Sequence, residues 1–107
     1  MIRISEIEID SVYLQEYIKI LQTESKASVQ KEPGVVAIFP MYQKESPTQI
    51  RILEIYANHA AYEDHLKSPH FQEYKSGTLK MVKSLKLIDM NCIDPETMAE
   101  LFRKLNQ

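Results

Sequence analysis

The stretch that decides the fold is Val35-Val-Ala-Ile-Phe-Pro-Met-Tyr42, which contains no charged side chain. Its apolar residues do not alternate with polar ones, and this pattern predicts a strand that is covered on both faces. Pro40 has no backbone N–H for a neighbouring strand, so we expect this strand at a sheet edge or with a bulge. A short turn at residues 44–48 leads to a second β-rich run at residues 50–57, and the pair predicts an antiparallel hairpin.

A first strand is predicted over residues 2–9, and its apolar pattern changes parity midway. Ile2 and Ile4 fall on one face, whereas Ile7 and Ile9 fall on the other. We therefore expect either a bulge at Ser5-Glu6 or a change of the covered face.

Helical periodicity predicts four helices between and after the strands. The first runs over residues 14–31 and ends at Glu32-Pro-Gly; the second runs over residues 60–67, with Asn58 as its N-cap. Ser68-Pro69 interrupts that helix and suits the start of another, since Ser is a good N-cap and Pro a good first helical residue. The remaining predicted elements are a helix to about residue 83, a last strand at 85–93 and a short helix after Asp94-Pro95.

The order β-α-β-β-α-β predicts an α+β fold, a ferredoxin-like split β-α-β sandwich with an antiparallel sheet. Its helices cover one face of the sheet only, whereas the run Val35–Tyr42 needs cover on both faces. A second copy packed sheet to sheet would supply that cover, and we therefore expect a homodimer. The alternative is that the C-terminal helix folds back over the open face.

Composition excludes several classes of protein. The 107 residues suffice for one compact domain, and a net charge of −2 gives no signature for binding nucleic acid or an anionic membrane. Two glycines are too few for a glycine-rich phosphate loop, and the single cysteine, Cys92, cannot form an internal disulfide. No window approaches the ~20 apolar residues of a membrane span. We expect a cytoplasmic protein with no signal peptide.

The sequence predicts no metal site. The three histidines, His59, His65 and His70, are six and five residues apart, which does not place them on one helical face, and Pro69 intervenes.

The strand at residues 50–57 and the helices after it carry the candidate site. Glu54 lies on the same strand face as Ile50 and Ile52, and a carboxylate in such an apolar run needs a partner if it is buried. His65, on the following helix, is the candidate partner. An apolar pocket with a few convergent polar groups is the usual form of a small-molecule site, although a core histidine bonded to Glu54 for structure alone fits the same pattern. The candidate substrate-binding walls are aromatic: Tyr56, Tyr62, Phe71 and Tyr74.

Two segments resemble the antibiotic biosynthesis monooxygenase family. They are Glu32-Pro-Gly-Val35 and Leu53-Glu-Ile-Tyr-Ala-Asn-His-Ala-Ala-Tyr-Glu-Asp-His-Leu-Lys-Ser-Pro-His-Phe71. The shared pattern is a Glu-Pro-Gly turn before the hairpin, a Glu-x-aromatic strand, a capped helix and His-Leu-x-Ser-x-His-Phe. The resemblance covers about residues 1–92, and this division predicts a domain at 1–92 followed by a helical tail at 93–107.

The resemblance implies a dimeric α/β barrel with a substrate pocket between sheet and helices. Family monooxygenases oxidise phenols, anthrones or quinols with dioxygen and without flavin, haem or metal, so no cofactor is expected. The deprotonated aromatic itself gives an electron to dioxygen, and the protein has only to remove a proton and exclude water. By position, His65 matches the family's helix histidine and Glu54 its strand carboxylate. His65 is then the candidate base and Glu54 the group that fixes its tautomer.

The same residues leave two other functions open. One is a non-oxidative isomerase of a small carbonyl compound that uses the same base. The other is a non-enzymatic, stress-associated dimer that binds a small ligand.

Overall fold

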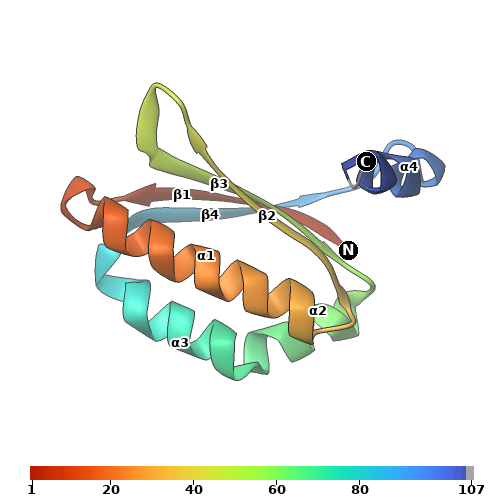
Figure 1. The fold of residues 1–107 in the computed structure, drawn as a ribbon, viewed down its shortest axis with the longest axis horizontal. Coiled ribbons are helices and arrows are strands. Elements are labelled where there is room, and N and C mark those ends of the chain that lie inside the picture. Colours follow the sequence, from red (N-terminus) through yellow and green to blue (C-terminus); the bar gives the residue numbers. More distant parts are fainter. Residues whose placement is uncertain (106–107) are drawn as a thin grey trace.

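The computed structural model describes residues 1–105, which form a four-stranded antiparallel sheet with three helices on one face (Figure 1). The strand order is β2-β3-β1-β4, the order of a ferredoxin-like sandwich, and it confirms the predicted α+β fold class. The elements are β1 (Ile2–Ile9), α1 (Leu14–Lys31), β2 (Val35–Gln43), β3 (Ser46–Tyr56), α2 (His59–Lys67), α3 (Pro69–Thr78), β4 (Val82–Met90) and α4 (Pro95–Leu105).

The edge position of β2 agrees with its proline. β2 pairs with β3 alone, with Pro40 opposite Ile52, so the missing N–H of Pro40 interrupts no ladder on a second side. The register shifts within β2 lie between Val35 and Ala37 and between Tyr42 and Gln43, at the two ends of the strand.

The parity change in β1 is a change of covered face, and no bulge occurs at Ser5-Glu6. The register with β3 is continuous from Ile2 to Glu8. Ile7 and Ile9 are buried in the core with Tyr17 and Leu21 of α1. Ile2 and Ile4, at the other parity, therefore point to the opposite face of the sheet.

The boundary between α3 and β4 differs from the prediction. We expected a helix to about residue 83 and a strand from 85, whereas α3 ends at Thr78, a 3₁₀ turn spans Leu79–Met81 and β4 begins at Val82. Met81 is fully buried and its carbonyl accepts a hydrogen bond from the Asp10 N–H. The burial of Met81 thus ends the helix early, although the helical pattern of the sequence continues to about residue 83.

No segment of the described residues 1–105 covers the open face of the sheet. Phe39 and Met41 of β2 are 46% and 42% exposed. Helix α4 lies beyond the end of β4, apart from α1–α3 (Figure 1). The tail helix thus does not fold back over Phe39 and Met41. The homodimer and the division of the chain at residue 92 stay predictions, and residues 106–107 of the predicted tail lie outside the described part.

No helix among the described residues is long and apolar enough to cross a membrane.

Gly34 marks a close approach between the start of β2 and helix α2. A Cβ at Gly34 would lie 2.5 Å from the Cβ of Ala61, well inside van der Waals contact. The Gly34 carbonyl also accepts a hydrogen bond from the Ala57 N–H at 2.8 Å, which holds this backbone in place.

Gly34→Ala is therefore expected to lower the free energy of unfolding by about 1–3 kcal/mol, as overpacking does. Urea denaturation measures the loss. Ala61→Gly removes the opposing Cβ and by itself costs about 1 kcal/mol in a helix. The double variant should be more stable than Gly34→Ala alone; strictly additive losses would show that this contact is not the cause.

Candidate active site

A cavity of about 370 Å³ lies between the sheet and the helices, and its lining is mostly apolar. Arg3 and Ser5 of β1 and Glu24 of α1 contribute polar groups to it. All six residues that the sequence singled out also line it, namely Glu54, Tyr56, Tyr62, His65, Phe71 and Tyr74.

Glu54 points toward the helices. It shares a strand face with Ile50 and Ile52, both buried in the core beneath α1. The Tyr56 hydroxyl donates to Glu54 Oε1 at 2.6 Å, and the Ser5 hydroxyl donates to Oε2. The carboxylate is thus held by two hydroxyl groups from β3 and β1. Burial, followed by the nearby charge of Glu54, raises the pKa of Tyr56, so this phenol stays a donor.

The prediction that Glu54 and His65 share a hydrogen bond is wrong. Among the described residues, the carboxylates next to His65 are those of Glu32 and Glu24. Glu54 instead has Tyr56 and Ser5 as partners. Both groups line one cavity, but each is fixed by its own set of contacts.

Two caps position the histidines. Asn58 Oδ1 accepts from the Ala61 N–H at 2.8 Å and starts α2, and Ser68 Oγ accepts from the Phe71 N–H and starts α3. Pro69 at the first position of α3 turns the chain after α2. This break between α2 and α3 brings the rings of His65 and His70 to a centroid separation of 6.2 Å.

Glu32 joins these two histidines. It is the C-cap of α1, in extended conformation before Pro33, and its N–H donates to the Ser28 carbonyl. Its Oε2 lies 2.8 Å from His65 Nδ1 and 2.6 Å from His70 Nε2. Because a carboxylate only accepts hydrogen bonds, each ring donates an N–H to it. In the neutral ring, the lone pair of His65 then lies on Nε2.

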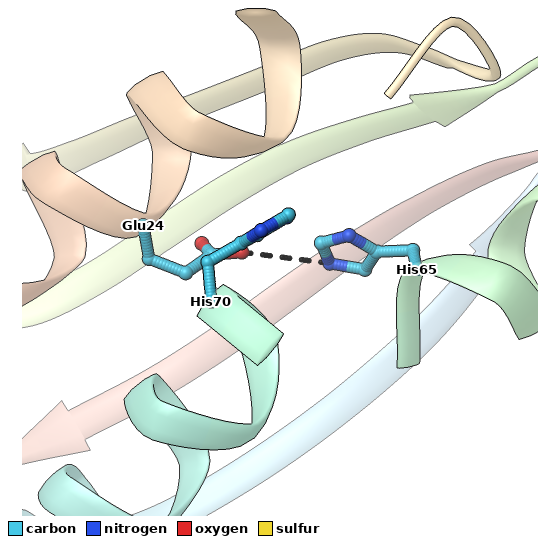
Figure 2. A group of neighbouring side chains, drawn as sticks. All are labelled: Glu24, His65 and His70. Atoms are coloured by element: carbon cyan, nitrogen blue, oxygen red, sulfur yellow. Dashed lines mark ion pairs between the residues drawn. The ribbon is translucent and has the colours of Figure 1, made fainter. Parts of the chain in front are cut away.

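Glu24 faces this free nitrogen. Its side chain is 6% exposed, and its Oε1 lies 3.6 Å from His65 Nε2 (Figure 2). The Ser28 hydroxyl donates to the same oxygen at 2.6 Å. Burial raises the pKa of Glu24, although the bond from Ser28 and the two histidines oppose this effect.

Aromatic rings close the cavity. Tyr56 packs edge-on against Tyr62 at a centroid distance of 5.2 Å, and Phe71 packs against the His65 ring at 4.9 Å. The Arg3 guanidinium lies over the Tyr62 ring and donates to its hydroxyl at 2.6 Å. The site thus combines flat apolar walls with the imidazole of His65 and the hydrogen-bonded carboxylates of Glu24 and Glu54.

The model of the antibiotic biosynthesis monooxygenase family matches residues 1–76. The chain belongs to this family.

Solved structures agree with this assignment. A Bacteroides thetaiotaomicron protein assigned to the same family is 46% identical, with a TM-score of 0.88 over 90% of this chain and 91% of that one. A Lactobacillus acidophilus protein assigned to the monooxygenases is 29% identical, with a TM-score of 0.78 over 80% of this chain and 41% of that one. A Nitrosomonas europaea protein, 14% identical with a TM-score of 0.82 over 88% and 90% of the two chains, shares the fold. Among curated proteins none matches.

Sequence reasoning found the family pattern but missed three members of the site: Glu24, Glu32 and His70. Glu32 and His70 lie within the family-like segments, yet their contacts join residues 33 and 38 positions apart, which no local pattern shows. Glu24 shares the buried stripe of α1 with Leu21 and Ser28. A charged residue on that stripe is the one signal that could have revealed it.

The wall next to Phe71 allows a direct test of packing. The hydroxyl groups of Tyr17 and Tyr74 lie 2.6 Å apart, and Tyr17 is fully buried. Burial raises the pKa of Tyr17 and also raises that of Tyr74, to about 12, so both phenols are neutral at ordinary pH.

Tyr74→Phe leaves the buried Tyr17 hydroxyl without its partner, and we expect a loss of about 1–3 kcal/mol in the free energy of unfolding. Replacing both tyrosines by phenylalanine removes the unpaired group and should restore part of that loss. Chemical denaturation of the two single variants and the double variant measures the coupling. Independent, additive losses would contradict the shared hydrogen bond.

Proposed function

We propose that the protein is a cofactor-independent monooxygenase acting on a small hydroxylated aromatic of the quinol or phenol type. The observation that supports this best is the arrangement of His65: Glu32 holds Nδ1, while the ring lines an apolar cavity of about 370 Å³. Membership of the family supports the general monooxygenase assignment. Dioxygen is the second substrate.

In the proposed reaction, His65 Nε2 takes the hydroxyl proton of the substrate. The resulting anion gives one electron to dioxygen, and the two radicals combine through a carbon–oxygen bond to a ring-bound peroxide. The proton on His65 passes to the outer peroxide oxygen. Loss of the proton on the ring carbon then breaks the O–O bond, forms a carbonyl and releases hydroxide, which takes up that carbon-derived proton as water. A hydroquinone and dioxygen thus give a hydroxyquinone and water.

The other residues of the cavity have supporting roles in this proposal. Glu54, already held by Tyr56 and Ser5, keeps lone pairs for a second hydroxyl group of the substrate. Tyr62 and Phe71 supply apolar walls for a flat ring, with Tyr74 beside Phe71. The walls also exclude water, which protects the peroxide and strengthens the polar contacts.

Oxygen uptake with a panel of hydroquinones tests the proposal. The wild-type protein should consume one dioxygen per quinol, and His65→Gln should lower kcat by about 10²–10⁴-fold, the usual contribution of a general base. His59→Gln is the matched control, because His59 is an exposed residue of α2 that pairs with Glu63 and lies outside the cavity.

No uptake with any quinol, or equal rates for His65→Gln and wild type, would contradict the proposal. Turnover of a carbonyl compound under nitrogen would favour an isomerase. If the wild-type protein shows no turnover and both it and His65→Gln bind a small ligand, a binding protein would be favoured.

We also propose that a second copy of the chain covers the open face of the sheet. Phe39 and Met41, with Met90 of β4, leave apolar side chains half exposed on β2 and β4. Half-exposed apolar side chains on both edge strands of this face favour burial against a partner, and pairing of identical faces gives a closed dimer.

A mass measurement in solution at micromolar concentration should therefore give twice the chain mass. Phe39→Asp should shift the protein toward monomer. Val12→Asp changes an apolar residue that is 83% exposed in the turn before α1, and should leave the mass unchanged. A wild-type monomer would remove the dimer proposal.

A further inference from the structure

The cluster of Glu24, His65 and His70 holds more than a proton acceptor. The three side chains come from α1, α2 and α3 and converge between these helices (Figure 2). Each offers one ligand atom, and the three atoms all lie within 4.8 Å of one another. The grouping depends on the break at Ser68-Pro69, since one continuous helix would not bring the histidines together.

The separation of Glu24 and His65 fits a shared ion better than a direct bond. The 3.6 Å between Glu24 Oε1 and His65 Nε2 is too long for a hydrogen bond. Two ligands of one tetrahedral Zn²⁺, each about 2.0–2.1 Å from the metal, lie about 3.3–3.4 Å apart. A small side-chain adjustment therefore suffices to place both atoms on one ion.

Glu32 prepares both rings for such an ion. It accepts hydrogen bonds from His65 Nδ1 and His70 Nε2, so in the neutral rings the lone pairs lie on His65 Nε2 and His70 Nδ1. Histidines that bind metals are commonly held in this way by a carboxylate behind them. The Ser28 hydroxyl likewise holds Glu24 at Oε1.

The local charges favour a cation. Glu24 is buried, Glu32 contacts both histidine rings, and Glu54 lines the same cavity as Glu24 and His65. Buried carboxylates are costly unless they are paired or bind a metal. The positive charge of an ion would offset that cost.

An ion also has a route to the cluster. A second cavity of about 370 Å³ lies against Glu24 and His70, and its wall includes the exposed residues Lys19 and Glu73. The cluster separates this cavity from the one next to His65, since Glu24 lines both. The second cavity leaves room for water as a further ligand.

We propose that Glu24, His65 and His70 bind a divalent transition-metal ion of the zinc class. Two imidazoles and one carboxylate form a ligand set that suits borderline ions such as Zn²⁺. Mg²⁺ and Ca²⁺ prefer sites made of oxygen ligands and should bind poorly. The inference goes beyond the proposed reaction, and a bound ion would inhibit that reaction because it takes the Nε2 lone pair of His65.

Calorimetric titration of the metal-free protein with zinc chloride tests this site. We expect one Zn²⁺ per chain, no binding of Mg²⁺, and affinities at least about 100-fold lower for Glu24→Gln and His70→Gln. Glu24→Gln retains the shape of the side chain. His59→Gln again serves as the control: it removes a histidine, as His70→Gln does, but should bind as wild type does.

Thermal melting without metal shows whether each variant folds, and added Zn²⁺ should raise the melting temperature of wild type and of His59→Gln alone. If a variant does not fold, X-ray absorption of the zinc-loaded wild type decides: it should show two imidazole nitrogens at about 2.0–2.1 Å. Absent binding, or unchanged affinity in both folded variants, would overturn the proposal. Oxygen uptake by the metal-free protein is a separate readout and tests the reaction alone.

Discussion

The carboxylate of Glu32 is the group on which the site depends. It lies where α1 ends, and it accepts hydrogen bonds from His65 of α2 and His70 of α3. Three helices that cover one face of the sheet are thereby tied together at one oxygen atom. Bonds from an imidazole to a carboxylate are among the stronger hydrogen bonds in proteins, and they are stronger where burial excludes water.

The chain around Glu32 makes this position possible. Pro33 disfavours a helical conformation at Glu32 and ends α1 there. Gly34 then lets the backbone pass close to Ala61 of α2 without a steric clash. A change in either residue would move the carboxylate relative to His65, so the Glu-Pro-Gly turn sets the chemistry as well as the fold.

The same contact decides what His65 can do. With Nδ1 committed to Glu32, the lone pair on Nε2 is the reactive part of the ring. In the apolar cavity it suits the removal of a proton from an aromatic hydroxyl group; with Glu24 and His70 it suits a metal ion. The proposed reaction and the proposed metal site both need His65 Nε2, so a bound ion would block the reaction. Activity of the metal-free protein and metal binding can therefore be measured separately.

Local patterns predicted most of the fold and part of the site. Parity placed Glu54 and Tyr56 on the helix-facing side of β3, and capping residues predicted the break between α2 and α3. The partner of His65 could not be predicted, because two carboxylates from α1 and its C-cap reach it across the fold. The closeness of His65 and His70 could not be predicted either, because sequence spacing does not show how α3 turns after Pro69 and brings the two rings together.

Nitrogen-15 NMR of the histidine rings near neutral pH tests the central claim, namely that Glu32 leaves His65 Nε2 with its lone pair. The neutral form of His65 in the metal-free protein should carry its hydrogen on Nδ1, and Glu32→Gln should weaken that preference. A neutral ring with its hydrogen on Nε2 would contradict the account.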